Sequence, residues 1–167
     1  VYIVLSNKTA PETAKRTFRS LKHRFATWDE LAAAPAREIR RLLRPAGLSA
    51  VKSRQLRGAL GKMREDFGEC SLRHLRRLSA EEAEAYLTSL QGISNKVAKC
   101  VMMYTLGFEV LPVDAHVHRI AVRLGWTARK RADQCHEELE SLVDPQLRFG
   151  FHVGCIAHGR AVCRPSN

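Results

Sequence analysis

Hydrophobic residues recur along the chain at the three- and four-residue intervals of an α-helix, and short segments rich in Pro, Gly, Ser and Asn separate them. After Pro35, for example, Ile39, Leu42 and Leu43 fall on one helical face. The alternating pattern of a half-buried strand is nearly absent. The sequence therefore predicts an all-α fold of about nine or ten short helices joined without a long linker.

Residues that favour helix starts punctuate the first half of the chain. Pro11 suits the first turn of a helix that runs to about Phe25. Two capping boxes of the form Ser/Thr-x-x-Glu, at 27–30 and 79–82, mark two further starts. Ser49 follows a turn at 45–48, and we expect it to cap a basic helix that runs to about residue 67.

The second half continues the helical pattern. We expect Gly107 to end one helix in the left-handed conformation and Asp114 to cap the next, which ends at Gly125. Two more helices are predicted at about 132–143 and 147–160. The helix that ends at Gly107 is expected to bury Val97, Ala98, Val101, Tyr104 and Thr105. The helix that Asp114 caps is expected to bury Val117, Ile120, Ala121 and Leu124.

The chain's size and charge narrow the class of protein. Its 167 residues suffice for one domain with a real core, or for two small lobes that share one. The net charge is +11, with +8 in residues 1–90 and +3 in residues 91–167. Such a field favours polyanions such as DNA, RNA or anionic lipid, although a merely soluble basic surface explains it equally well.

No apolar run reaches the length of a membrane span and no secretory leader is visible, so we expect a soluble, intracellular protein. The five cysteines contain no C-x-x-C pair, which argues against a disulfide framework. The chain has no initiator methionine, and residues 1–5 read as the inner end of a buried helix. We therefore expect a fragment of a longer protein.

A turn at residues 91–94 opens a helix that presents Lys96, and Asp114 opens the next helix. The amides of such a turn can hold a phosphate, and the helix dipole beside Lys96 favours the neutral, nucleophilic amine. Each feature also has an ordinary explanation: a helical hairpin, a solvated lysine and an aspartate that only caps a helix. The combination of the three favours chemistry on DNA.

Two segments carry a family resemblance. Residues 90–98 read L-Q-G-I-S-N-K-V-A, and residues 112–125 read P-V-D-A-H-V-H-R-I-A-V-R-L-G. They resemble the helix-hairpin-helix (HhH-GPD) DNA glycosylases, and within these the endonuclease III branch, whose pattern is L-P-G-V-G-x-K-T/V-A followed by V-D-T-H-V-x-R. In that branch the aspartate lies 18 residues after the lysine, the same interval that separates Lys96 from Asp114.

The resemblance covers essentially the whole chain and extends to residues 5–9, to Gly47 and Leu48 with Lys52, and to residues 158–160. It implies a two-lobed helical protein, with lobes 1–108 and 109–167 and a hairpin motif at about 83–106. Double-stranded DNA with a damaged or abasic nucleotide would bind in a cleft between the lobes. The target nucleotide would be flipped out of the stack, because its sugar cannot be attacked inside it.

The resemblance also implies the reaction. Lys96 would attack the sugar C1′, expel the base and form a Schiff base that permits elimination of the 3′ phosphate. Asp114 would stabilise positive charge on the sugar and assist deprotonation of the amine. Family members without a lysine at this position are generally monofunctional. The chain is therefore expected to be a monomeric base-excision repair enzyme, a DNA N-glycosylase with abasic-site (AP) lyase activity, and to act on oxidised pyrimidines.

Further DNA contacts come from the same resemblance. Lys8 falls where the family places a gap-filling residue, often glutamine, and Leu48 where it places an apolar wedge. Leu48 could equally be a staple that packs on the next helix. Ser94 replaces the second glycine of the hairpin, which tightens the conformation required there. The residues expected to contact DNA are Gly92, Ile93, Ser94, Asn95, Lys8, Leu48, Lys52 and His116.

Cys163 matches the first of four cysteines that bind a [4Fe-4S] cluster in the endonuclease III branch, 49 residues after Asp114. One cysteine cannot hold a cluster, so no cofactor is required within this chain, and a cluster is expected only in a longer form. His116, His118, His152 and His158 lack metal-ligand spacing and read as packing residues or phosphate contacts.

Other functions stay open from the sequence. A non-catalytic helix-hairpin-helix module could use the turn and the basic helices for structure-selective DNA binding, and a basic helical scaffold could bind protein partners. The first would not need Lys96 and Asp114 together. Among glycosylases, relatives that remove mismatched thymine or uracil, 8-oxoguanine or 5-methylcytosine are alternatives to the oxidised-pyrimidine enzyme.

Overall fold

The computed structural model describes residues 1–166, and in these residues every regular element is a helix. The predicted all-α fold is therefore confirmed. The chain divides into two compact units, Val1–Ile93 and Ser94–Asn167, each of which is described by itself. In the described residues no helix has both the length and the apolar character that a membrane crossing needs.

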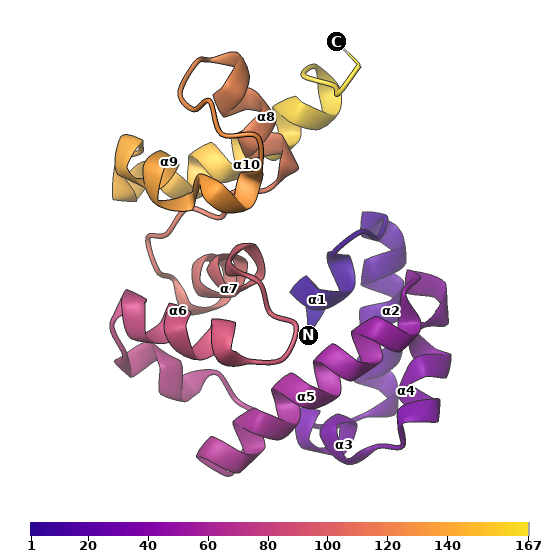
Figure 1. Cartoon of the computed structure of the whole chain (residues 1–167). Coiled ribbons are helices and arrows are strands. Elements are labelled where there is room, and N and C mark those ends of the chain that lie inside the picture. The colour runs from indigo at the N-terminus through magenta and orange to yellow at the C-terminus, as the bar shows by residue number, and fades with distance from the viewer. Residues whose placement is uncertain (167) are drawn as a thin grey trace. The chain divides into compact units, whose positions relative to one another are not determined.

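The first unit is organised around α5, its longest helix. Helices α3 and α4 pack against α5, and α1 packs against both α2 and α5 (Figure 1). The buried contacts include Leu5, Leu21, Ile39, Leu43 and Leu56, each no more than 2% exposed. The elements are α1 (Tyr2–Ser6), α2 (Pro11–Arg24), α3 (Trp28–Ala33), α4 (Ala36–Leu43), the 3-10 turn η1 (Arg44–Ala46), α5 (Ser49–Phe67), η2 (Arg73–Arg77) and α6 (Ala80–Ser89).

Side-chain caps mark the starts of α3 and α6. The Ser79–Glu82 capping box is complete, with each side chain bonded to the other residue's amide. Thr27 accepts a bond from the amide of Glu30, but the Glu30 carboxylate accepts from Ala26 rather than from Thr27. The prediction that Ser49 caps α5 is wrong. Ser49 is the first helical residue, and Leu48 precedes it in a left-handed conformation.

The second unit is built from shorter helices around a separate core. Its elements are α7 (Asn95–Val101), the π-helical turn η3 (Met102–Leu106), α8 (Ala115–Arg123), η4 (Ala132–Gln134), α9 (His136–Leu142), η5 (Pro145–Leu147) and α10 (Arg148–Ala161). Helices α8 and α10 pack on each other. The core is Leu111, Val113, Val117, Ala121, Cys135, Leu139, Val143 and Cys155.

Two expected inward faces end earlier than predicted. Val97 and Ala98 are buried, but Tyr104 is 47% exposed and Thr105 is exposed, because the backbone changes from α to π at Met102 and shifts the face that points inward. Leu124 is 57% exposed because α8 ends one residue before it. Gly107 and Gly125 are left-handed, as expected at these chain reversals.

The division by contacts falls after Ile93, directly before α7. The boundary predicted at 108/109 concerns lobes that bind DNA, and it stays a prediction, as does the cleft between them. Of the residues expected to hold phosphate, Gly92 and Ile93 end the first unit, whereas Ser94 and Asn95 lie in the second with Lys96 and Asp114.

Candidate catalytic site and nucleic-acid contacts

Lys96 is the second residue of α7 and its side chain is half-buried. The two residues after it, Val97 and Ala98, are 3% and 0% exposed and fix this end of the helix in the core. Ser94 precedes the helix with an ordinary φ of −84°, so the serine that replaces the expected second glycine needs no left-handed conformation. The hairpin sequence is therefore compatible with serine at this position.

Asp114 caps α8. Its Oδ1 accepts bonds from the amides of His116 (2.8 Å) and Val117 (2.9 Å). The residue before it, Val113, is 1% exposed, so the approach to the cap is anchored in the core. Because both capping bonds go to Oδ1, the cap does not use Oδ2. The capping role and a role in chemistry are therefore compatible in one side chain.

The second unit brings Lys96 and Asp114 into one electrostatic neighbourhood. Burial raises the pKa of the Cys100 thiol, the Lys96 charge lowers it and the Asp114 charge raises it further. Cys100 lies one helical turn after Lys96 and is 5% exposed. Lys96 and Asp114 both therefore lie near Cys100.

His152 and Tyr104 belong to the same neighbourhood, and the sequence did not identify either as a site residue. His152 is 1% exposed, and its Nδ1 lies 2.8 Å from the carbonyl of Pro112. Burial lowers the pKa of His152, Asp114 raises it, and Lys96 lowers it. The Tyr104 ring lies 5.8 Å from the His152 ring. The histidine thus holds the backbone that leads to Asp114.

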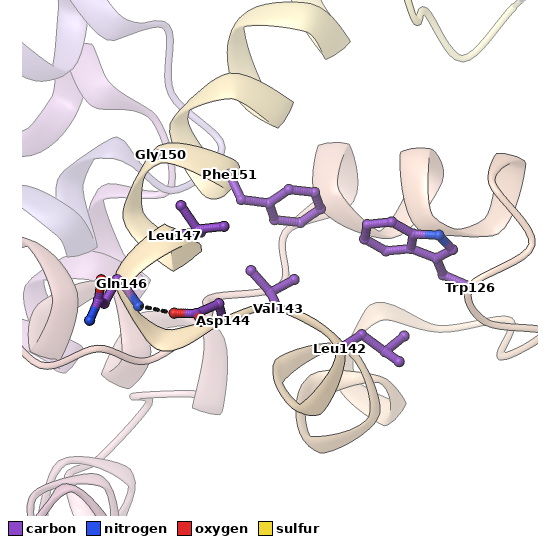
Figure 2. Close-up of a pocket in the computed structure, with 8 residues that line it drawn as sticks. All are labelled: Trp126, Leu142, Val143, Asp144, Gln146, Leu147, Gly150 and Phe151. Atoms are coloured by element: carbon purple, nitrogen blue, oxygen red, sulfur yellow. Dashed lines mark hydrogen bonds between the residues drawn. The ribbon is translucent and has the colours of Figure 1, made fainter.

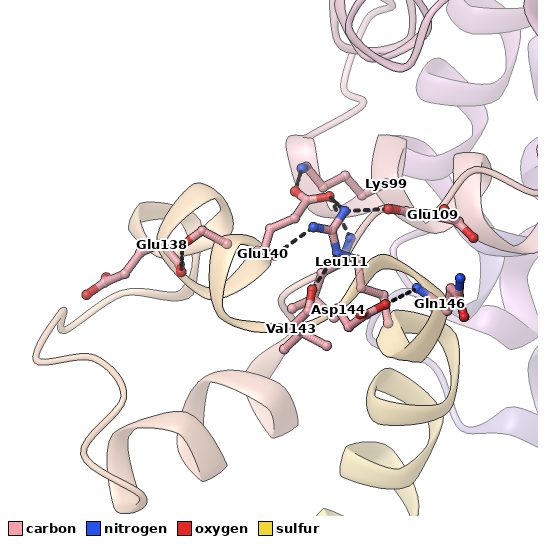
Figure 3. Close-up of polar contacts among 10 residues, drawn as sticks. Lys99, Glu109, Leu111, Glu138, Glu140, Val143, Asp144 and Gln146 are labelled. Carbon is pink, nitrogen blue, oxygen red and sulfur yellow. Dashed lines mark hydrogen bonds and ion pairs between the residues drawn. The ribbon is translucent and has the colours of Figure 1, made fainter.

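A buried polar network also holds the segment that leads to Asp114 (Figure 3). The Glu140 carboxylate accepts bonds from the Leu111 amide (3.0 Å), Arg148 (3.3 Å) and Lys99. Arg148 also donates to the carbonyl of Glu109 at 2.6 Å. Lys99 lies on α7, one turn after Lys96, whereas residues 109–111 lead to Asp114. The network therefore ties the Lys96 helix to the segment that presents Asp114.

The turn at residues 90–93 is seated on α5. The Ile93 amide donates to the Leu90 carbonyl at 3.1 Å, and Gly92 has a φ of +76°. Gln55 donates to the Gly92 carbonyl at 3.1 Å, and a Cβ at Gly92 would lie 2.6 Å from Gln55 Cγ. Position 92 thus requires glycine for two reasons: its φ is positive, and a Cβ would collide with Gln55. Phosphate contacts from Gly92, Ile93, Ser94 and Asn95 stay a prediction.

Lys8 and Leu48 share an unusual backbone. They are the non-glycine residues with positive φ in the described part of the chain, at 53° and 48°. Each such residue costs about 1 kcal/mol or more, and such strain gathers at functional sites. Both side chains are exposed, Leu48 at 55%, so packing of Leu48 as a staple does not bury it. Exposure and strain together fit residues that enter DNA.

Lys52 occupies a different place from the DNA contact that we expected. It is 2% exposed, and its ammonium donates to the carbonyls of Leu5 (2.9 Å) and Ala46 (3.0 Å) and to the Thr9 hydroxyl. A direct phosphate contact would break these bonds. The structure therefore gives Lys52 an internal role.

His116 packs on α10. Its Nδ1 lies 3.0 Å from an Arg119 nitrogen, and a Cβ on Gly159 would lie 2.5 Å from the same atom. Arg119 also donates to the carbonyls of Gly159 (3.0 Å) and Cys163 (2.9 Å). His116 therefore serves the contact between α8 and α10, and its contact with DNA stays a prediction.

A [4Fe-4S] cluster does not fit the residues of this chain. Cys163 is 7% exposed, and its sulfur accepts a bond from Arg123 at 2.9 Å. A cluster of this kind needs four cysteine thiolates. No group of three or more His, Cys, Asp or Glu that could hold a metal ion occurs in residues 1–166. No step of the chemistry below passes through a cluster.

An apolar pocket on the second unit holds neither candidate catalytic residue (Figure 2). Trp126 and Phe151 stack at 5.5 Å on one side of it, and its single carboxylate, Asp144, accepts a bond from the Gln146 amide. The pocket is lined by Trp126, Leu142, Val143, Asp144, Gln146, Leu147, Gly150 and Phe151. The pocket therefore lies apart from the candidate catalytic residues.

Comparison with known protein families gives one match that covers most of the chain. The model of the HhH-GPD superfamily base excision DNA repair proteins matches residues 1–145. The chain is 34% identical over 157 residues to the DNA glycosylase/AP lyase ROS1 of Arabidopsis thaliana, which covers 83% of this chain and 11% of that protein. It is 26% identical over 164 residues to endonuclease III of Thermotoga maritima, and the match covers 98% of this chain and 73% of that protein.

Solved structures agree on the fold. A trapped covalent endonuclease III–DNA intermediate matches 99% of this chain and 74% of its own with a TM-score of 0.85, at 23% identity. A further Arabidopsis thaliana relative, 33% identical over 162 residues, shows how much longer such proteins are. The chain spans 55% of its length.

Proposed function

Because the chain belongs to the HhH-GPD superfamily of base-excision DNA repair proteins, in its endonuclease III-like branch, we propose that it is a DNA glycosylase with AP lyase activity. The observation that carries the proposal is the Glu140 network, which ties the helix of Lys96 to the segment that presents Asp114. A module that only binds DNA needs neither an amine nor a carboxylate in such an arrangement.

In this proposal the Lys96 amine attacks C1′ of a flipped nucleotide, and the bond from C1′ to the base breaks as the base leaves with the electron pair. Asp114 takes up the proton of the attacking amine and stabilises the positive charge that develops on the sugar. The C1′–O4′ bond then breaks, the ring oxygen takes up a proton, and a Schiff base remains between C1′ and Lys96. Water takes the C2′ proton, and its electron pair expels the 3′ phosphate as the C3′–O bond breaks.

The Asp114 cap supports this assignment on structural grounds. Two backbone amides donate to Oδ1 and fix the orientation of the carboxylate. This orientation does not require a side-chain partner at Oδ2. Fixed groups contribute more to catalysis than mobile ones because their ordering precedes the reaction. His152 and the Glu140 network fix the preceding segment, residues 109–112.

Oxidised pyrimidines are the base class that we propose, on the basis of the endonuclease III-like branch. A panel of single-lesion duplexes tests this choice, with thymine glycol, a thymine–guanine mismatch, 8-oxoguanine and 5-methylcytosine as the four arms. Release of thymine glycol above the other three supports the choice. Preferential release of any other base replaces it without affecting the proposed lyase.

Sodium borohydride trapping tests the reaction itself. The native chain, incubated with an abasic duplex and borohydride, should form a covalent protein–DNA complex. Lys96→Ala should form none, although it should still bind the duplex. Salt-dependent binding without any trapping by the native chain would favour the non-catalytic DNA-binding module.

A further inference from the structure

Within residues 1–166, the ammonium of Lys52 is buried and has no carboxylate partner. Lys52 is 2% exposed, and its three acceptors are two backbone carbonyls and a hydroxyl. Burial lowers the pKa of Lys52. A buried charge without a counter-ion is costly, and an apolar side chain of the same length would avoid that cost. The presence of lysine therefore needs a geometric explanation.

The three acceptors come from three different segments. Leu5 belongs to α1, Thr9 to the loop between α1 and α2, and Ala46 to η1. An ammonium has three N–H donors, so Lys52 uses all of them in these bonds. The Thr9 hydroxyl also donates to the Ala46 carbonyl at 2.7 Å. Lys52 and Thr9 together thus fasten the loop after α1 to the turn before α5.

Each fastened segment carries one strained, exposed residue. Lys8, with a φ of 53°, directly precedes Thr9, and Leu48, with a φ of 48°, lies two residues after Ala46. A left-handed non-glycine residue persists only where its surroundings hold it. The bonds to Thr9 and Ala46 are next to these two residues in the chain and supply that restraint.

We propose that Lys52 is a positioning residue that holds Lys8 and Leu48 as a fixed pair for insertion into the DNA duplex. The inference rests on the proposed function, because insertion matters only for a protein that opens the base stack. Lys52 itself touches no DNA. It acts through the two loops, and it is needed only when the stack must be opened.

Lysine suits this role better than arginine or an apolar residue. Its compact ammonium directs three donors to separate acceptors, whereas the planar guanidinium of arginine directs five donors in a fixed fork. Lys52→Met retains the length of the side chain and removes all three bonds. The variant thus tests the bonds rather than the volume.

The test compares an abasic site in a duplex with the same abasic oligonucleotide as a single strand, which needs no insertion. Single-turnover borohydride trapping is measured on both. For Lys52→Met we expect the duplex rate to fall about tenfold or more, since a small misplacement of positioning groups has effects of this size. The single-strand rate should stay within about twofold of native.

Lys62→Met is the matched control. Lys62 lies on the same helix, at its surface, paired with Asp66. The trapping rates of Lys62→Met on duplex and on single-stranded DNA should both stay within about twofold of native. If Lys52→Met lowers the two rates equally, or lowers neither, the inference is overturned.

Thr9→Val provides a milder variant if Lys52→Met does not fold, as judged by circular dichroism. It removes the hydroxyl that joins Lys52 to the Ala46 carbonyl and leaves the other two lysine bonds in place. We expect a loss of about fivefold on duplex DNA, the equivalent of one hydrogen bond, and none on the single strand. Equal losses on both substrates contradict the inference.

A double-mutant comparison isolates the route of the effect. If Lys52 acts through Lys8 and Leu48, then adding Lys52→Met to a Lys8→Ala/Leu48→Ala variant should not lower the duplex rate further. If Lys52→Met lowers the duplex rate of that variant as much as it lowers the native rate, Lys52 does not act through Lys8 and Leu48. Failure of the native chain to trap on either substrate refutes the proposed function instead, so the two failures are distinguishable.

Discussion

Replacing Glu140 with glutamine should destabilise the second unit, because Glu140 is the carboxylate on which its buried cations converge. Lys99 and Arg148 both donate to Glu140, and the Leu111 amide donates to Oε1 at 3.0 Å. Glutamine keeps the shape and the oxygen that faces Leu111. It removes the negative charge and points an amide N–H₂ at the Lys99 ammonium.

The burial of Lys99 and Glu140 determines how much unfolding free energy the substitution removes. The side chains of Lys99 and Glu140 are 6% and 16% exposed, so solvent screens their interaction little. Removal of one member of a buried pair costs about 3–5 kcal/mol. Because glutamine retains the bond to Leu111, we expect the lower end, about 3 kcal/mol of unfolding free energy. Lys99→Met should cost only about 1–2 kcal/mol, since Glu140 keeps Arg148 and Leu111.

Urea unfolding of both single variants and the double variant measures the interaction between the two residues. The double variant has no ammonium facing the glutamine amide, so its loss should be smaller than the sum of the single losses by about 2 kcal/mol. Agreement with the sum to within about 0.5 kcal/mol would refute the reasoning, because independent residues behave in this way.

Three further predictions concern the same unit. Gly159→Ala should cost about 1–3 kcal/mol in urea unfolding, because its Cβ would lie 2.5 Å from His116 Nδ1, whereas Gly154→Ala, where a Cβ meets nothing within 4 Å, should not. Asp114→Asn should abolish trapping on abasic DNA yet keep its unfolding midpoint, since asparagine also caps helices; a folded variant that still traps abasic DNA would assign Asp114 to the cap alone. Burial lowers the pKa of His152 below its ordinary 6.5, so the unfolded chain binds the proton more readily. The contribution of neutral His152 to the unfolding free energy should be at its maximum above pH 6.5 and should decline as the pH falls below 6.5. A pH slope unchanged by His152→Asn would contradict this.

Local features of the fold were predictable from the sequence because short-range contacts decide them. The Ser79 capping box, the Asp114 cap and the left-handed Gly107 each depend on residues within about four positions. Ser49 was predicted wrongly because Leu48, in a left-handed conformation, takes the cap position, and a leucine in the sequence does not indicate such a backbone. The π turn after α7 also escaped prediction, since a helical pattern does not distinguish α from π hydrogen bonding.

The supports of the candidate site were not predictable because they join distant positions. Lys99 and Glu140 are 41 residues apart, and Lys52 lies 43 residues from Thr9. In the sequence both lysines are ordinary basic residues, which are usually exposed. Lys96 and Asp114 were identified from their spacing and the family resemblance. Their catalytic roles stay proposals.

Mapping the trapped complex tests the central claim most directly. The native chain would be reduced with borohydride on an abasic duplex, digested with protease and nuclease, and analysed by mass spectrometry. The proposal predicts one modified residue, Lys96, joined to the sugar through a secondary amine. A modification on the exposed Lys8, or on any other amine, would contradict the assignment of Lys96 as the nucleophile.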